Sequence, residues 1–362
     1  MTTLRARGGE DVSQDGASRP GRSPRAFGRS AGFAQRVCLL VVIAALIALF
    51  ASLRGAFLDQ QLVVFPMLRD IATLTVVGLA QLAVLSVGHM NLAVGRMAAF
   101  SAMFMGLAYQ DWHLPLYAGL AVGLAAGAAI GALTGWIIAV TGVNSFVVTL
   151  AMDFALLGLV SLVYAQFATG AAFTAKPAGM EALRDYSMAD LCAGNLCGSP
   201  AVPQLLLFTV VAMVLVGYLY SRTRQGRELL LVGSNITAAE LSGIPTRRRV
   251  VTAHALSGTL AGLAGFMLAV ASGSFTAGIG SEFMIPSFLG PVLGGTLLTG
   301  GVVSVVGTLL GTSLVQVIRQ GLTTLGTGLE NLNIYLGVIL LVALSTDRIR
   351  TAVSTKRTVA SS

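Results

Sequence analysis

The sequence predicts an all-α polytopic membrane protein with about ten transmembrane helices. Hydrophobic residues make up 55 % of its 362 residues, charged residues only 10 %, and the mean hydropathy is +0.82. Soluble domains carry about 25 % charged residues, so soluble globules of this composition would lack the polar surface to cover themselves. The 43 glycines are typical of helices that pack closely in lipid.

Basic residues are concentrated in three segments that flank apolar runs. Residues 1–36 hold seven arginines, residues 222–249 hold six, and residues 347–362 hold four basic side chains. The rule that positively charged loops stay inside places all three in the cytoplasm. We expect 1–36 to be a disordered basic tail and 347–362 a second tail. Because this pattern reports topology, the pI near 9.9 does not indicate a nucleic-acid partner.

The apolar runs define the expected transmembrane domain, residues 37–346. A helix needs about 20 apolar residues to cross a bilayer. The expected spans are 37–53, 71–87, 92–108, 116–140, 146–165, 205–220, 250–271, 283–298, 302–318 and 334–344. If the N-terminus is cytoplasmic, the first six spans bring the chain back to the cytoplasm at the basic loop. The last four bring it back again at the C-terminal tail. Eight spans would do the same if two segments were re-entrant.

The longest polar loop, residues 166–203, follows the fifth span and is therefore expected outside the cytoplasm. Cys192 and Cys197 lie in this loop. An oxidising compartment would permit a disulfide between them. No histidine accompanies the two cysteines, so we expect no metal site there.

Two glycine-interrupted stretches, residues 86–95 and 293–301, fall at membrane depth, one in each half of the chain. Non-helical backbone is tolerated at that depth only when it is buried in protein or lines a cavity. Paired breaks in two halves point to a substrate pathway. The alternative is that these glycines only let helices approach each other closely.

The basic loop is the most specific segment of the sequence. It reads GRELLLVGSNITAAELSGI at 226–244, followed by three arginines at 247–249 and HALSG at 254–258. This resembles the cytoplasmic loop of ABC importer permeases of the ribose/xylose/galactoside type, within the branched-chain amino acid/monosaccharide permease superfamily. Three further runs resemble motifs of that family: GHMNLAVG at 88–95, VNSFVVTL at 143–150 and LGGTLLTGG at 293–301.

The resemblance implies a type II ABC importer fold in the bacterial cytoplasmic (inner) membrane. In that family two permease subunits, identical or different, form the pathway, and a periplasmic solute-binding protein delivers the solute. Cytoplasmic ABC ATPase subunits dock on a short helix of the basic loop. The implied docking residues are Ala238, Ala239, Glu240, Leu241, Ser242 and Gly243.

The residues themselves also predict a short helix here. Thr237 can cap its N-terminus, with Glu240 completing a capping box, and Gly243 can end it in a left-handed conformation. Without the resemblance, an ordinary solvated helix between two spans is the alternative.

The chain departs from the family where the family has two aspartates, which are replaced here by Asn91 and Pro286. These losses leave the solute open. Asp153 should face the bundle interior or a watery cavity, because a charge exposed to lipid is costly. His89 either contacts solute or bonds to backbone freed by the glycines, and Arg96 either snorkels or pairs with a carboxylate. The candidate pathway residues are Gln81, His89, Asn91, Asn144, Phe146, Thr149, Asp153, Gly294, Gly295 and Thr296.

No motif in the sequence indicates an enzyme. The phosphate-binding pattern G-x-x-x-x-G-K-[ST] does not occur, so this chain does not hydrolyse ATP by that route, and we expect no cofactor. We expect a permease subunit for a small hydroxylated solute, a monosaccharide, driven by a separate ATPase. The alternatives are a permease for nucleosides, branched-chain amino acids or another polar metabolite, a stand-alone ion-coupled carrier that would depend on Asp153, and a membrane interaction protein with decayed transport.

Overall fold

The computed structural model describes residues 24–168, 172–185, 187, 202–326 and, singly, 334, 337 and 338, with side chains from residue 35 onward. These ranges are helical apart from loops and two short strands, as the hydropathy predicts. In chain order the elements are α1 (Pro24–Leu53), η1 (Gly55–Leu58), η2 (Gln60–Val64), α2 (Phe65–Leu85), α3 (Val94–Gln110), α4 (Leu116–Thr141), α5 (Ser145–Phe167), β1 (Ala172–Phe173), α6 (Met180–Asp185), α7 (Leu205–Arg222), α8 (Arg224–Ser234), α9 (Ile236–Leu241), α10 (Thr246–Ser272), β2 (Phe275–Thr276), α11 (Pro286–Leu293) and α12 (Val305–Thr324).

Within the described ranges, seven helical segments are long and apolar enough to cross a membrane. They are Gln35–Leu53, Gln60–Leu85, Leu116–Thr141, Ser145–Phe167, Leu205–Arg222, Thr246–Ser272 and Val305–Thr324. α3 has 17 residues and α11 only eight, because each adjoins one of the glycine-interrupted stretches. The expected span 283–298 is therefore a half-length helix. The expected last span, 334–344, lies almost wholly outside the described residues.

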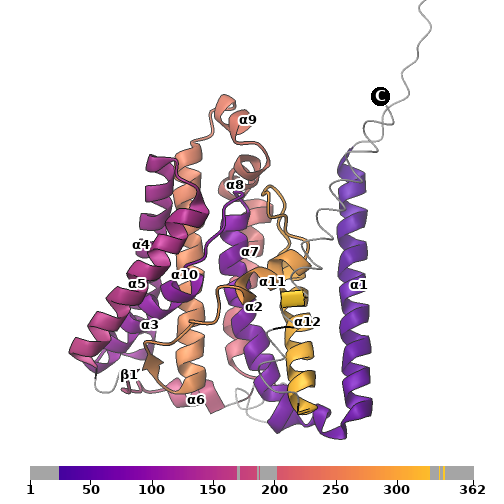
Figure 1. Cartoon of the computed structure of the whole chain (residues 1–362), viewed down its shortest axis with the longest axis vertical. Helices are drawn as coiled ribbons and strands as arrows, with labels where there is room; N and C mark the ends of the chain where they lie inside the picture. Colours follow the sequence, from indigo (N-terminus) through magenta and orange to yellow (C-terminus); the bar gives the residue numbers. More distant parts are fainter. Residues whose placement is uncertain are drawn as a thin grey trace, which may run out of the picture.

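The helices run between two ends of the molecule (Figure 1). α8 and α9 lie at one end, and α6 and the antiparallel pair of β1 with β2 lie toward the other. α10 stands in the middle and packs against α2, α3 and α4, whereas α1 stands at one side against α12. α1 begins at Pro24, within the segment 1–36 that we expected to be a disordered basic tail.

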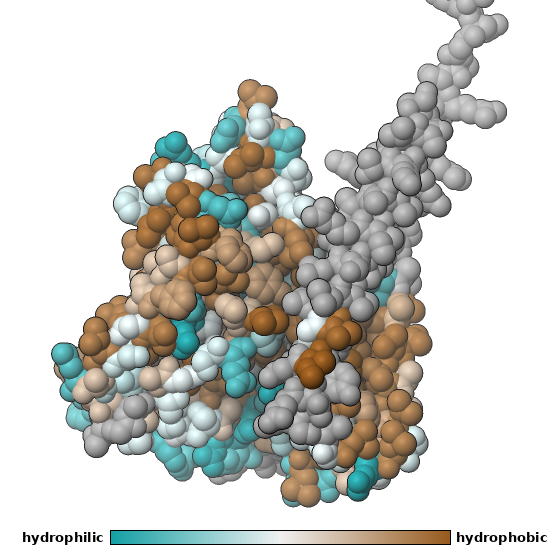
Figure 2. All heavy atoms as spheres, in the orientation of Figure 1, coloured by the Kyte–Doolittle hydropathy of each residue, from teal (hydrophilic) through white to brown (hydrophobic). Residues whose placement is uncertain are grey.

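The outer surfaces of the peripheral helices are apolar. Hydrophobic atoms cover much of the surface in Figure 2, including the side of α1. On α7 the exposed side chains include Val210, Val214 and Leu215. A soluble protein rarely exposes a continuous apolar patch of this kind, so these faces fit contact with the lipid bilayer.

The most extensive helix contact lies between α4 and α10 and depends on small residues. On α4, Gly127, Gly131 and Gly135 recur every four residues; the first two face Gly258 and the backbone of His254 on α10, and Gly135 faces Val251 and the His254 side chain. A Cβ atom at any of these glycines would overlap the facing helix. Close approach of backbones through small residues is how helices associate in lipid, and here it places α10 at the centre of the bundle.

Candidate translocation and docking site

The first break, residues 86–93, separates α2 from α3 and is held by buried polar side chains. The Gln81 amide pairs with both backbone groups of Asn91: Nε2 donates to the carbonyl oxygen at 2.9 Å, and Oε1 accepts from the backbone N–H at 3.2 Å. The Asn91 side chain accepts from the Ala93 N–H at 3.0 Å and donates to the Ser257 hydroxyl on α10 at 3.1 Å. The amide at position 91 thus uses its acceptor and its donor in fixing the loop.

The start of α5 holds the other side of the first break. The Ser145 hydroxyl accepts from the Met90 N–H, and the Thr149 hydroxyl accepts from the Leu92 N–H, both at 3.2 Å. These bonds satisfy backbone groups that the broken helix leaves unpaired, as buried backbone requires. Of the predicted pathway residues, Gln81, Asn91 and Thr149 therefore come together as supports of the loop.

In the described part of the chain, the predicted pathway residues Asn144, Phe146 and His89 do not hydrogen-bond to the backbone of the first break. Asn144 caps α5 by accepting from the Phe146 N–H at 2.9 Å, and both residues are exposed. His89 lies within the first break, where its Nδ1 is 3.4 Å from Nε2 of His254, a fully buried residue of α10. Sequence reasoning did not connect these two histidines, which are far apart in the chain.

The second break, residues 294–304, separates α11 from α12. Gly295, Gly300 and Gly301 have φ values of +89°, +91° and +81°, a region that L-residues with side chains rarely adopt. The Thr296 hydroxyl accepts from the Ser304 N–H at 3.2 Å and closes the loop. Gly294 packs against the backbone at the start of α12.

The two breaks touch each other, and α8 touches both. The Gly301 N–H donates to the Ser86 carbonyl oxygen at 3.1 Å. A Cβ at Gly88 would lie 2.9 Å from the Thr299 carbonyl oxygen. Gly233, near the end of α8, fits against this junction so closely that a Cβ there would overlap the Ser86 carbonyl and the Gly301 nitrogen. The basic loop is thus in direct contact with both halves of the broken backbone.

The predicted docking residues form the short helix α9 and its C-terminal turn, but its N-terminal cap differs from our expectation. Asn235 caps it by accepting from the Ala238 N–H at 3.0 Å, and Thr237 lies inside the helix. Glu240 accepts from the Thr246 hydroxyl at 3.0 Å instead of completing a capping box with Thr237. Asn ranks above Thr as an N-cap, and two candidate caps this close together are hard to separate by sequence.

The end of α9 agrees with the prediction. Gly243 has a φ of +73°, and the Ile244 N–H donates back to the Ala239 carbonyl at 3.0 Å. Ala239 is buried, whereas the Leu241 side chain is 87 % exposed. Beside it lies an open groove lined by Glu240, Gly243, Ile244, Pro245, Thr246, Arg247 and Arg248. Ala238 and Ser242 are also exposed. An apolar knob next to a basic groove is suited to a protein partner.

α8 is fixed to α10 by a charged brace. Glu228 lies between Arg224 of α8 and Arg249 of α10, with nitrogen–oxygen distances of 2.7 Å to each. The hydrogen bond from Arg224, followed by the charge and hydrogen bond of Arg249, holds the pKa of the Glu228 carboxyl below its ordinary value. The brace is therefore ionised at neutral pH, and it ties the orientation of α8 to the start of α10.

Asp153 lines a small cavity together with Arg96. Their side chains are 3.8 Å apart, and the cavity has a volume of about 200 Å³. Its other walls include Gly95 of α3 and Ser281 from the loop before α11. The Asp153 carboxylate is thus partly neutralised by Arg96. Of the two alternatives for Arg96, the structure shows the pairing with a carboxylate.

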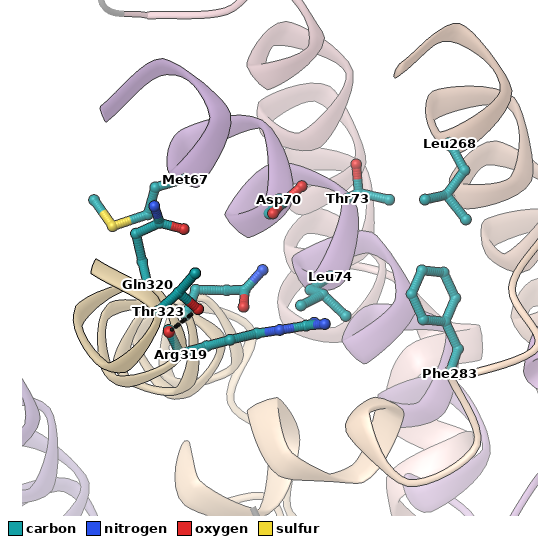
Figure 3. A pocket seen from close by; sticks show the side chains of 10 residues that line it. Met67, Asp70, Thr73, Leu74, Leu268, Phe283, Arg319, Gln320 and Thr323 are labelled. Carbon is teal, nitrogen blue, oxygen red and sulfur yellow. Dashed lines mark hydrogen bonds between the residues drawn. The ribbon is translucent and has the colours of Figure 1, made fainter. Parts of the chain in front are cut away.

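A second, larger cavity of about 290 Å³ lies between α2 and α12 in the half of the molecule away from α9 (Figures 1 and 3). We call it the outer cavity. Its polar walls are Asp70, Thr73, Gln316, Arg319, Gln320 and Thr323. Sequence reasoning missed all six, because the charges lay at or just beyond the ends of the predicted apolar runs. The helical spacing of polar residues at 316, 319, 320 and 323 could have revealed this face.

Cys192, Cys197 and the proposed disulfide lie outside the described residues. Among the described residues, no group of three or more potential ligands could hold a metal ion.

Comparison with known proteins identifies the family. The family model described as branched-chain amino acid transport system / permease component matches residues 63–344. The chain is 35 % identical over 320 residues, 88 % of this chain and 91 % of the relative, to the probable ABC transporter permease protein YphD of Escherichia coli (strain K12). It is 28 % identical to the autoinducer 2 import system permease protein LsrD of Yersinia enterocolitica, over 78 % of this chain and 82 % of the relative.

The LsrD protein of Photorhabdus temperata is likewise 28 % identical, over 84 % of this chain and 88 % of the relative. No solved structure matches the chain. The family match covers most of the sequence, including both breaks and α9, and it agrees with the seven candidate spans. The chain therefore belongs to the branched-chain amino acid transport system / permease component family and is a multi-pass permease subunit of an ABC importer, not an enzyme.

Proposed function

We propose that this permease carries a small hydroxylated solute, a monosaccharide, and that a separate ABC ATPase drives it by docking on α9 and the adjoining basic groove. The observation that carries the docking proposal is the continuous contact from α9 through α8 to both breaks. Leu241 presents the exposed end of this path, and Gly233 presents the other end against Ser86 and Gly301.

The proposed mechanism is alternating access. Closure of the ATPase dimer pushes α9, and α8 transmits the movement because its Thr223 cap, its Glu228 brace and its packing on α7 make it a rigid unit. Movement of Gly233 then changes the contact between the Gly301 N–H and the Ser86 carbonyl. Packed elements switch between discrete arrangements. A change in this contact can therefore move the two breaks from an arrangement that closes the pathway to one that opens it.

The proposal extends to the membrane arrangement and the partners of the chain. α9 faces the cytoplasm in this proposal, and the N-terminal end of α1 lies at the same end of the molecule (Figure 1), which supports a cytoplasmic N-terminus. A periplasmic solute-binding protein delivers the solute at the opposite end. A second permease subunit, a further copy of this chain or a related one, completes the pathway.

The pairing of Asp153 with an arginine favours transport driven by ATP over transport coupled to an ion. An ion-coupled carrier would need an intramembrane carboxylate that is free to bind and release the ion. Asp153, the predicted candidate for that role, lies 3.8 Å from Arg96, which weighs against it. The family is named for branched-chain amino acids and two relatives for autoinducer 2, so the solute class is the part that experiment must decide.

Changing Leu241 to aspartate should abolish uptake. The substitution places a charge where the proposed ATPase contact needs an apolar side chain, and removing a central anchor of an interface costs about 2 kcal/mol or more, a loss of about 30-fold in affinity. The measurement is uptake of ¹⁴C-labelled pentoses and hexoses by cells that express the complete importer, together with the amount of chain in the membrane.

The conservative variant Leu241→Met serves as the control, because it keeps the apolar contact and should keep uptake. Sugar uptake by Leu241→Asp at the wild-type rate, with equal protein in the membrane, would remove α9 as the docking site. Uptake of ¹⁴C-leucine but of no sugar by the wild-type importer would replace the monosaccharide with an amino acid.

A further inference from the structure

We propose that the outer cavity is a binding site for the transported solute, and that it selects a small, uncharged, polyhydroxylated molecule. The proposal rests on the importer function above and adds to it the residues that hold the solute. None of them belongs to the two breaks or to α9.

The polar wall of the outer cavity holds hydrogen-bonding groups that the protein leaves unused. Gln316 is only 3 % exposed, yet within the described part of the chain its amide makes no hydrogen bond. The side chains of Asp70, which is exposed, and of Arg319 and Gln320, which are half-buried, also make no hydrogen bond there. An amide as buried as that of Gln316 is costly without a hydrogen-bond partner, and Asp70 and Arg319 place opposite charges on the same cavity. The cavity is therefore built to contain water or a polar ligand.

The apolar side chains of the lining are distributed around the cavity: Met67 and Leu74 lie on α2 among the polar residues, whereas Leu268 and Phe283 lie on the side away from α12 (Figure 3). Met67, Leu74, Leu268 and Phe283 complete the lining, and Figure 3 shows Arg319 extending from α12 toward Leu74 and Phe283. The cavity thus offers hydrogen-bond donors and acceptors together with apolar contacts. A sugar ring has the same combination, with hydroxyl groups around its edge and C–H groups on its faces.

The size and the charge of the cavity narrow the ligand class. A volume of about 290 Å³ lies at the lower end of the range for small-molecule sites, which is about 300–1,000 Å³. One acidic and one basic side chain balance each other, and neutral amides and hydroxyls outnumber them. A neutral polyol can use all of these groups at once. A zwitterionic amino acid would use chiefly Asp70 and Arg319, and would leave the Gln316 and Gln320 amides without partners.

The outer cavity is closed on its inner side by direct packing of α2 on α12. One turn or less beyond the cavity, the hydroxyl groups of Thr75 and Thr312 are hydrogen-bonded at 2.8 Å. One turn further, Gly78 packs against Thr308. Past this contact, α2 ends in the first break and α12 begins at the second. A solute in the cavity would therefore lie between the two helices whose inner ends form the junction that α8 touches.

Cysteine protection tests the site directly. In a chain with Cys38, Cys192 and Cys197 changed to serine, Gln316→Cys is placed in the complete importer in right-side-out membrane vesicles. A membrane-impermeant methanethiosulfonate reagent is added with or without each transported ¹⁴C-sugar. We expect the sugar to slow labelling of position 316 at least about five-fold. Thr323→Cys, at the exposed mouth of the same cavity, gives a second position in case Gln316→Cys impairs folding.

Asp111→Cys is the matched control, because Asp111 is an exposed residue at the C-terminal end of α3, outside the cavity. It should be labelled at the same rate with and without sugar. If the importer takes up a sugar and that sugar protects neither cavity position, the binding site is wrong while the proposed function stands. If ¹⁴C-leucine protects both positions and sugars do not, the ligand class is wrong. If the wild-type importer takes up no sugar at all, the proposed function itself fails.

Discussion

Gly233→Ala should reduce solute uptake at least about ten-fold while leaving the ATPase bound. The added Cβ would overlap the Ser86 carbonyl and the Gly301 nitrogen, so the 3.1 Å hydrogen bond between these groups cannot persist unchanged. Loss of a buried hydrogen bond costs about 1–3 kcal/mol, and about 1.4 kcal/mol already corresponds to a factor of ten. Because α9 is not altered, docking should be unaffected.

Gly217→Ala on α7 is the matched control, since no atom lies within 4 Å of the Cβ it would add. Both variants are measured for sugar uptake and for the amount of ATPase that copurifies with the tagged chain. Wild-type uptake by Gly233→Ala would show that α8 does not transmit movement to the breaks. Loss of both uptake and ATPase would show that the substitution acts on docking instead.

Gly258→Val should have the largest effect on stability. A side chain there would overlap the backbone of Gly127 and crowd Gly131, and backbone cannot move aside as a flexible side chain can. Overpacking of this kind costs about 1–3 kcal/mol, occasionally more, which corresponds to a fall in Tm of about 1–4 °C for a chain of this size. The measurement is thermal unfolding of the detergent-purified permease.

Gly217→Val provides the comparison, because it adds the same side chain where the structure has space. Its Tm should stay within about 0.7 °C of wild type, because a substitution of this kind changes stability by about 0.5 kcal/mol or less. Equal Tm values for the Gly258 and Gly217 variants would contradict the close approach of α4 and α10, and with it the central position of α10.

The fold class could be predicted because hydropathy reports burial in lipid directly. Runs of apolar residues locate most spans to within a few residues, and clustered arginines indicate the loop that holds α8 and α9. The end of α9 could also be predicted, since Gly243 follows a helical pattern at the position where a left-handed residue ends a helix. Each of these depends on residues that are neighbours in the sequence.

The site was predicted less completely because its contacts join distant residues. The glycines of both breaks were found, but their mutual contact runs through backbone atoms of Ser86 and Gly301, which leave no side-chain pattern. The close approach of Gly233 to this junction leaves no side-chain pattern either. Gln81, Asn91 and Thr149, which we predict along the pathway, hydrogen-bond to the backbone of the first break, because broken helices must satisfy their backbone in a dry interior.

The outer cavity could not be predicted from the sequence for a different reason. Asp70 and Arg319 belong to different halves of the chain, and a hydropathy profile treats each as the edge of an apolar run. Only the packing of α2 on α12 places them at one cavity. Their shared environment is a tertiary fact that a single sequence does not contain.

The most direct test of the central claim is to identify the proteins that bind this chain in its native membrane. The tagged chain is extracted in mild detergent, with and without prior crosslinking, and copurifying proteins are identified by mass spectrometry. We predict recovery of an ABC ATPase, crosslinked through α9, together with a second permease subunit. Reproducible recovery of the intact chain alone, with crosslinking also failing to capture an ATPase, would contradict the claim that a separate ATPase drives this permease through α9.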